Sequence, residues 1–535
     1  MRLDTQRAEW YFCVWRICLF SIEGEYDCRV LLISADIESV RKKWMEQLKK
    51  PSVTFAMLKS KEGISFAFMY LSAVLKKRGF RTSLLVAENA DDFIKRFSQR
   101  PTPVVAFSVT TGLHRYYAQW GACLKRRFDV YTVFGGPHPT YFPDFIHHVG
   151  VDAVCVGEGE ESFPEFMEGF NEFPGPSEKA IAGFIHKCNG KILDGGIRFP
   201  VSDLDKLPSP DWGLCYEANP ALGLHHVKSF LATRGCPYHC TYCFNRVWNE
   251  RYKGKAQTIR VRDPEAVVKE IQAVGLRWPM RLVWFLDANF ACNRKWLREF
   301  LPLYRQRVGL PFFCKVRPNA VNQQLAEELV QAGCTSVGIG IESGNDEMRK
   351  GMLERNISEK QILDACDAFH QRGVLIMSFN MVGLPGETYE MACETLDLNV
   401  RSKVDYAMTM MLQPYPSTEI ARRAERMGVF NGDFDALSSS YFCPSTIRFE
   451  NERARKRMVN LQRLMALAVS FPEVRRHLNR LTAMPENSFY LEVFKKYNHM
   501  VFHKKFYRAF GLQKRRRDDI GGKSIIWRTL TKLVG

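Results

Sequence analysis

Three cysteines on one short stretch have a spacing suited to metal chemistry. Cys236, Cys240 and Cys243 occur in RGCPYHCTYCF at residues 234–244, which is the spacing CxxxCxxC. Three thiolates on one loop can hold three irons of a [4Fe-4S] cluster and leave the fourth iron open to another ligand. A structural zinc would need a fourth ligand, for which His239 is the only local candidate. The spacing favours the open cluster, with a structural metal as the alternative because the chain has sixteen cysteines.

Strand-like and helix-like runs alternate after these cysteines. β-Branched and apolar residues form six strand-like runs, at 227–233, 281–290, 311–316, 336–342, 374–381 and 406–412. Amphipathic runs predict helices at 263–273, 294–308, 322–332, 358–372 and 388–402. This alternation predicts a partial (β/α)6 TIM-type barrel, whose active site lies at the carboxyl ends of its strands. The polar residues that follow these ends are Asp287, Asn289, Arg317, Asn319, Glu342, Ser343, Asn380 and Gln413.

A second alternating region precedes the cysteines. Strand-like runs at 29–35, 81–87, 104–109, 130–134 and 151–156 alternate with helical patterns such as 63–78 and 115–127. They predict an α/β domain with a Rossmann-like, doubly wound sheet, which binds ligands at the carboxyl ends of its strands. Small residues follow three of these runs, in SVTTG (108–112), GGPH (135–138) and GEGE (157–160). Glycine there lets the backbone approach a large ligand, and ordinary turns are the alternative.

The cysteine loop, with SFLATRG at 229–235, resembles that of the radical S-adenosylmethionine (SAM) superfamily. The resemblance implies that the open iron binds SAM and that an electron from the cluster cleaves it to a 5′-deoxyadenosyl radical. GIGIESG at 338–344 and NMVGLPGE at 380–387 resemble the family's SAM-contacting segments. FLDANF at 285–290 takes the place of the segment that holds the methionine amino group, with Asp287 as the carrier. The cofactor-binding residues predicted in this region are Tyr242, Asp287, Arg317, Glu342, Ser343 and Asn380.

GGPHPTYFPD at 135–144 and VDAVCVGEGEESFPEF at 151–166 resemble the cobalamin-binding domain that precedes many radical SAM enzymes. Domains that supply a lower axial histidine carry Asp-x-His-x-x-Gly after the first strand, whereas here that stretch reads SADIES at 34–39. None of the twelve histidines has Asp two residues before it, so we expect no such histidine ligand. The resemblance implies cobalamin binding by Ser108, Thr110, Gly135, Gly136, His138, Gly157, Glu158 and Gly159. A contact of His138 with a cofactor edge, or simple packing, is favoured over cobalt ligation.

The predicted boundaries are an N-terminal extension (1–27), a cobalamin-binding domain (28–170), a linker (171–226), a radical SAM barrel (227–428) and a helical region (429–535). The linker contains a hairpin pattern at 180–197 around Asn189-Gly190. Of the net charge of +18, most lies at the end of the chain, where residues 446–535 contain 21 Lys and Arg against 7 Asp and Glu. Helices are expected at 453–469 and 489–510. The run QKRRR at 513–517 indicates a solvated helix end, or contact with an anionic membrane surface or acidic partner.

Nothing in the sequence predicts a membrane span or a leader peptide. The apolar run at 10–22 is shorter than the roughly 18 residues that a span requires, contains Arg16 and precedes no small-residue cleavage site. The other cysteines are scattered, as in proteins with reduced thiols. We therefore expect a cytoplasmic protein. The cysteines without paired spacing, from which we expect no auxiliary cluster, are Cys314, Cys334, Cys366, Cys393 and Cys443.

The two resemblances together favour a cobalamin-dependent radical SAM methyltransferase acting on an unactivated carbon of a small molecule. Its partners would be that substrate and an electron donor such as flavodoxin or ferredoxin, and we do not expect nucleic acid. An oxidative cyclase or rearrangement enzyme of the same architecture is the close alternative. A transfer-RNA methylthiotransferase is a weaker one, because the contexts of Cys28, Cys123 and Cys155 indicate packing and the tail pattern is helical. A cobalamin sensor would not explain the cysteine loop.

Overall fold

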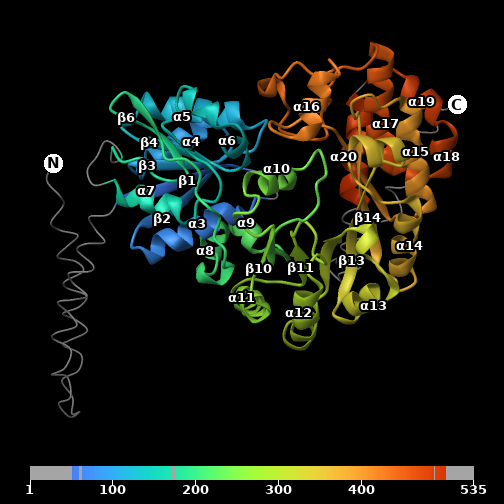
Figure 1. Cartoon of the computed structure of the whole chain (residues 1–535), viewed down its shortest axis with the longest axis horizontal. Helices are drawn as coiled ribbons and strands as arrows, with labels where there is room; N and C mark the ends of the chain where they lie inside the picture. Colours follow the sequence, from blue (N-terminus) through green and yellow to red (C-terminus); the bar gives the residue numbers. More distant parts are fainter. Residues whose placement is uncertain (1–50, 60–62, 171–175, 177, 487, 502–535) are drawn as a thin grey trace, which may run out of the picture. The chain divides into compact units, whose positions relative to one another are not determined.

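The computed structural model describes residues 51–59, 63–170, 176, 178–486 and 488–501 (Figure 1). Its N-terminal part is a seven-stranded sheet in the order β2-β1-β3-β4-β5-β6-β7. Strands β1 to β5 are parallel and β6 and β7 are antiparallel to their neighbours. The strands are β1 (Ser52–Leu58), β2 (Arg81–Ala87), β3 (Val104–Ser108), β4 (Tyr131–Gly135), β5 (Ala153–Cys155), β6 (Phe184–Cys188) and β7 (Lys191–Asp194).

One strand of this sheet was not predicted. β1 pairs with both β2 and β3, which is the position expected for the run at 29–35. That run lies outside the described residues, as does SADIES at 34–39. In the described sheet the first strand is β1, and the residue that follows it is Lys59. The surrounding helices are α3 (Phe66–Lys77), α4 (Ala90–Phe97), α5 (His114–Lys125), α6 (Pro137–Tyr141), η1 (Pro143–His147) and α7 (Ser162–Glu168).

The predicted hairpin forms, and it belongs to this sheet. Asn189 and Gly190 make the turn between β6 and β7, both with positive φ. Phe184 to His186 of β6 pair with β5, so the hairpin extends the first sheet instead of standing in a separate linker. The chain then continues through η2 (Leu204–Lys206), α8 (Trp212–Ala218) and α9 (Pro220–Gly223) to the second sheet.

The second sheet has six parallel strands in the order β15-β14-β13-β12-β11-β8. β8 and β15 stand at its two ends, so the barrel is open. This confirms the predicted partial (β/α)6 arrangement. The strands are β8 (Val227–Phe230), β11 (Leu282–Phe285), β12 (Phe312–Val316), β13 (Cys334–Glu342), β14 (Leu375–Val382) and β15 (Tyr406–Met411).

Helices between these strands bury their apolar faces on the sheet and begin at side-chain caps. Asp263 caps α11 through the amide of Ala266, and Ser358 caps α14 in a reciprocal box with Gln361. Buried side chains of α11 to α14 and of the strands form one core. These helices are α11 (Pro264–Arg277), α12 (Arg294–Arg307), η3 (Pro318–Ala320), α13 (Gln323–Gln331), the π-helix η4 (Glu347–Met352), α14 (Glu359–His370) and α15 (Tyr389–Arg401).

The first barrel strand is shorter than predicted. β8 ends at Phe230, and the chain turns before β9 (Thr233–Gly235), which pairs with β10 (Ile259–Val261) in a separate two-stranded sheet. The cysteine loop leaves β9 and leads into α10 (Phe244–Arg251). The predicted strand at 281–290 also ends early, at Phe285, because Asp287 turns inward and accepts a hydrogen bond from the amide of Thr233, ahead of the cysteine loop.

The described residues after the barrel, up to Val501, are largely helical, as predicted. α17 packs against α15 and β15 in a second core, and Figure 1 shows these late helices together, coloured orange to red. No helix within the described residues is both long and apolar enough to cross a membrane. The elements are α16 (Glu419–Arg426), η5 (Phe434–Ala436), α17 (Glu452–Ser470), α18 (Pro472–Arg476), α19 (Leu478–Ala483) and α20 (Ser488–Val501).

Candidate active site

The cysteine loop is held on both sides by hydrogen bonds. The amide of Thr241 donates to the Leu353 carbonyl at 3.1 Å, and the Asn249 side chain donates to the Cys236 carbonyl at 2.9 Å. Burial raises the pKa of the Cys236 and Cys243 thiols. Such thiols keep their protons until a metal ion replaces them. The loop therefore presents preformed ligands that a metal cluster would stabilise.

Two arginines point at the middle cysteine. Arg317 Nη1 lies 3.5 Å from the Cys240 sulfur and Arg355 Nη1 lies 3.9 Å from it. Both arginines are buried, and Arg317 also stacks on the Tyr238 ring at 3.8 Å. Guanidinium groups at this distance stabilise a thiolate, or the negative charge of a thiolate-bound cluster.

The three thiols suit a cluster better than a single ion. Among the described residues, no three His, Cys, Asp or Glu side chains converge to hold one metal ion. A [4Fe-4S] cluster does not need that convergence, because each cysteine binds a different iron. The residues present therefore fit a cluster with three protein ligands.

The chain after β13 brings a second polar group to this loop. Arg355 bridges the Tyr242 hydroxyl (3.4 Å) and the Gly340 carbonyl (2.6 Å). Burial raises the pKa of Glu342, which Arg355 and a hydrogen bond from Tyr242 oppose. Glu342 has a φ of +67°, a strained conformation for a residue other than glycine. The hydroxyl of Ser343 beside it is buried and has no hydrogen-bond partner among the described residues, so it could bond a ligand at this strand end.

Two predicted cofactor-binding residues are already occupied by the protein itself. Asp287 accepts hydrogen bonds from the Ala232 and Thr233 amides at 3.3 and 2.6 Å and from the Thr233 hydroxyl at 2.6 Å. Asn380 bonds to the Ser378 hydroxyl and the Asn399 amide at 2.9 and 2.8 Å. Asp287 therefore orients the segment leading into the cysteine loop, and Asn380 ties β14 to α15.

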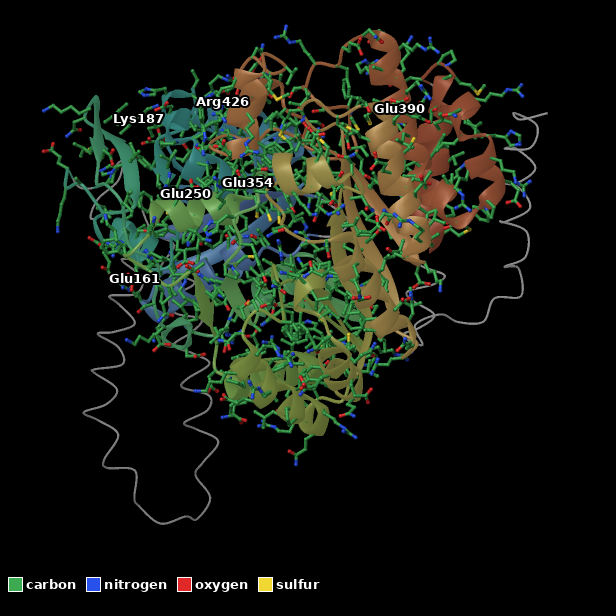
Figure 2. The ribbon with its side chains drawn as sticks, turned by 45° about the vertical axis from the view of Figure 1, so that its right-hand side comes forward. Glu161, Lys187, Glu250, Glu354, Glu390 and Arg426 are labelled. Atoms are coloured by element: carbon green, nitrogen blue, oxygen red, sulfur yellow. The ribbon has the colours of Figure 1, made fainter. Side chains whose placement is uncertain are left out.

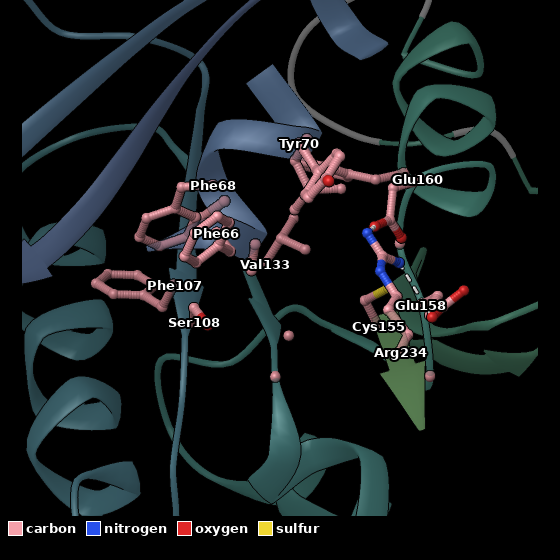
Figure 3. A pocket seen from close by; sticks show the side chains of 18 of the residues that line it. Phe66, Phe68, Tyr70, Phe107, Ser108, Val133, Cys155, Glu158, Glu160 and Arg234 are labelled. Carbon is pink, nitrogen blue, oxygen red and sulfur yellow. Dashed lines mark ion pairs between the residues drawn. The ribbon is translucent and has the colours of Figure 1, made fainter. Parts of the chain in front are cut away.

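A cavity of about 300 Å³ opens at the carboxyl ends of the first sheet (Figure 3). Phe66, Phe68, Tyr70 and Phe107 line it with apolar surface. Gly136 has a φ of +96°, and a Cβ there would lie 2.8 Å from the Val109 nitrogen, so only glycine fits that wall. The predicted residues that line this cavity are Ser108, Gly135, Gly136, Gly157, Glu158 and Gly159.

The other two predicted residues, Thr110 and His138, are not among those that line this cavity. Thr110 is exposed. The His138 ring stacks on that of His114, with centroids 4.0 Å apart, and its Nδ1 bonds the Thr111 hydroxyl at 3.0 Å. Burial lowers the pKa of His138 to about 3, so this histidine, on α6, is neutral and packs against the His114 ring.

Ion pairs join the fifth-strand loop of the first sheet to the strands beside the cysteine loop. Arg260 on β10 binds Glu158 at 2.7 and 2.8 Å. Arg234 on β9 binds Glu158 at 3.0 Å and Glu160 at 2.6 Å, drawn as dashed lines in Figure 3. The Tyr141 ring also stacks on Phe244, at the start of α10, at 4.3 Å. The cavity and the cysteine loop are therefore adjoining parts of one site.

Models of two known families match these two parts of the chain separately. A model of the radical SAM superfamily matches residues 230–398, and a model of the B12 binding domain matches residues 60–167. The chain therefore contains both a B12-binding domain and a radical SAM domain. The radical SAM match begins in β8 and includes all three loop cysteines, and the B12-binding match includes the glycine-rich strand ends.

Curated relatives and a solved structure match more than half of this chain. An uncharacterized methyltransferase of Pyrococcus horikoshii is 26% identical over 335 residues, which cover 61% of this chain and 70% of that protein. The anaerobic magnesium-protoporphyrin IX monomethyl ester cyclase of Rubrivivax gelatinosus is 23% identical, covering 68% of this chain and 66% of the cyclase. The structure of the methyltransferase TsrM from Kitasatospora setae, with cobalamin and a [4Fe-4S] cluster bound, superposes with a TM-score of 0.60 at 16% identity. It covers 79% of this chain and 90% of TsrM, so the fold is shared.

Two residues of the radical SAM domain were not predicted as site residues. Arg355 follows η4, away from any strand end, so no local pattern marks it. Asn289 was noted only as a polar residue after β11. Both polar atoms of its side-chain amide are buried and find no partner in the part of the chain that the structure describes, which leaves them available to a ligand.

Proposed function

We propose that this B12-binding radical SAM enzyme is a cobalamin-dependent methyltransferase that methylates an unactivated carbon of a small molecule. The observation that carries the proposal is the set of ion pairs from Glu158 and Glu160 to Arg234 and Arg260, which fastens the B12-binding cavity beside the cysteine loop. When bound, the cluster supplies the electron that cleaves SAM, and cobalamin carries the methyl group. The protein's share is to hold both in one site from which water is excluded.

Different residues would hold the cluster, SAM and cobalamin. Cys236, Cys240 and Cys243 would hold the cluster, with Arg317 and Arg355 balancing its charge. The unpartnered amide of Asn289 and hydroxyl of Ser343 are suited to polar groups of SAM, since buried polar atoms otherwise lack compensation. Ser108 and the glycines at the ends of β4 and β5 line the cavity that would hold the cobalamin.

The alternatives are separated by their products or by their cysteines. Oxidative cyclization or rearrangement uses the same two domains, and a cyclase is among the relatives. A methylthiotransferase would need a second cluster. Burial raises the pKa of Cys155 to about 12, and Cys123 lies half-buried on α5. Cys28 lies outside the described residues. These contexts favour packing roles and thus the methyltransferase.

The test is a turnover assay with anaerobically reconstituted protein, SAM and a chemical reductant. We expect 5′-deoxyadenosine and S-adenosylhomocysteine together, with a methylated product detected by mass spectrometry of host metabolites. Cys236→Ala should abolish SAM cleavage, and Cys123→Ala, on α5, should leave it intact. Cleavage that survives Cys236→Ala would refute the assignment. Deoxyadenosine without S-adenosylhomocysteine would instead favour the cyclase alternative.

We further propose that the enzyme works in the cytoplasm, where thiols stay reduced, and that it takes its electron from a flavodoxin or ferredoxin. The basic run QKRRR at 513–517, with its suggested contact to an anionic surface, lies outside the described residues.

A further inference from the structure

The cysteine loop has an outer face that the proposed reaction does not use. A pocket of about 470 Å³ lies there, formed by the loop, α10 and the chain leading to β10. His239, which is exposed, and Trp248 line it. Asn249, in the same wall, donates the hydrogen bond to the Cys236 carbonyl at 2.9 Å. A single hydrogen bond thus connects the wall of the pocket to the backbone of Cys236, a proposed cluster ligand.

The opposite face of the loop is closed to a protein partner. Cys240 is only 5% exposed and faces Arg317, which follows β12, and Arg355, which follows η4. Under the proposed function this inner side also receives SAM. An electron from a protein donor therefore has to arrive from the side of His239.

This outer face is basic. The segment at residues 244–257 contains Arg246, Arg251, Lys253 and Lys255 against one acidic residue, Glu250. Arg246 is paired with Glu250 and Glu354, which are labelled in Figure 2. Lys253 and Lys255 are exposed, and neither forms an ion pair with any residue that the structure describes. Lys255 lies over the exposed Phe199 ring at 5.8 Å, so its ammonium group stays at the surface, and both lysine charges can face a partner.

We propose that this face is the docking surface for a small acidic electron-transfer protein. The inference rests on the proposed function, which requires a reduced cluster. In the step, the donor is oxidised by one electron and the cluster held by Cys236, Cys240 and Cys243 is reduced by one electron, with no bond or proton transferred. The interfaces of electron-transfer complexes are small, often under about 1,200 Å², so a pocket with two exposed lysines beside it suits one. Exposed charges of this kind act mainly by steering the encounter.

The experiment compares two reductants in the reconstituted full-length enzyme. SAM cleavage is measured with dithionite, which needs no docking, and with flavodoxin reduced by its reductase. The test variant is Lys253→Glu with Lys255→Glu. The control is Lys191→Glu with Lys360→Glu, the same change of charge at exposed lysines on β7 and α14.

We expect the test variant to raise the KM for flavodoxin by about tenfold or more, while the dithionite rate stays unchanged. The control should match the parent enzyme with both reductants. In the parent, the flavodoxin rate should fall with added salt and the dithionite rate should not. An unchanged KM in the test variant, or an equal rise in the control, overturns the docking surface. Absence of SAM cleavage with dithionite in the parent enzyme would overturn the proposed function instead.

Discussion

Asp287 gives the sharpest test of how this site is built. The sequence motif assigns its carboxylate to the methionine amino group of SAM. In the structure the carboxylate is fully buried and accepts three hydrogen bonds from Ala232 and Thr233, just ahead of the cysteine loop. If these bonds are its purpose, Asp287 is a positioning residue, and its loss should weaken the loop before it weakens SAM binding.

The structure sets the size of the effect. Asp287→Ala leaves two amides and one hydroxyl buried without acceptors, and each unsatisfied donor costs about 1–3 kcal/mol. Burial raises the pKa of Asp287, so its removal also relieves some desolvation, and we expect a net loss of about 3 kcal/mol. At about 2.1 cal/mol/K per residue, a unit spanning 51–535 shifts by about 1 °C per kcal/mol, so Tm should fall by about 3 °C.

The assay combines thermal unfolding of the metal-free protein with SAM binding to the reconstituted protein. Asp287→Asn keeps one oxygen that can accept both bonds from Thr233, so it should cost only about 1 kcal/mol and leave the Kd for SAM within about threefold. A direct charge-assisted bond to SAM would be worth about 1.5–3 kcal/mol, or more than tenfold in Kd. An unchanged Tm in Asp287→Ala together with a tenfold loss of SAM affinity in Asp287→Asn would refute the reasoning.

Three further predictions concern buried charges. Arg355→Met removes a positive charge beside Cys240, so the cluster's midpoint potential, measured by paramagnetic resonance titration, should fall, with Arg355→Lys in between; a rise would contradict this. Glu158→Gln breaks the charge pairing between the domains and should cost about 3 kcal/mol in thermal unfolding. Its exposed neighbour Glu161→Gln should cost less than about 1 kcal/mol, and equal losses would rule out a special role for Glu158. Burial raises the pKa of Glu387 from 4.5 to about 8, so its favourable contribution is present below pH 4.5 and lost as pH rises through 8. Glu387→Gln should therefore gain stability relative to the parent between pH 6 and 9 in urea unfolding, and a constant difference would count against it.

Short-range sequence patterns were enough to predict the barrel strands and the role of the cysteine loop. Period-two and helical patterns located the six barrel strands, because burial of one face imposes that spacing wherever the strands later pack. Cys236, Cys240 and Cys243 lie within eight residues, so their shared role does not depend on the rest of the fold. The same local logic missed β1 (Ser52–Leu58), directly after Pro51, whereas the strand predicted at 29–35 lies outside the described residues.

Only the tertiary structure decided which partner each polar side chain hydrogen-bonds. Arg355 reaches Cys240 across 115 residues, and Arg260 reaches Glu158 across 102. Asp287 follows its strand as the motif predicts, and its hydrogen-bond donors, Ala232 and Thr233, lie 55 and 54 residues earlier, just ahead of the cysteine loop. Such contacts depend on the order of strands in each sheet and on which way a side chain faces, and sequence spacing carries neither. The sequence alone thus determined that three thiols would stand on one loop beside a parallel barrel. The folded chain decided which charges surround them.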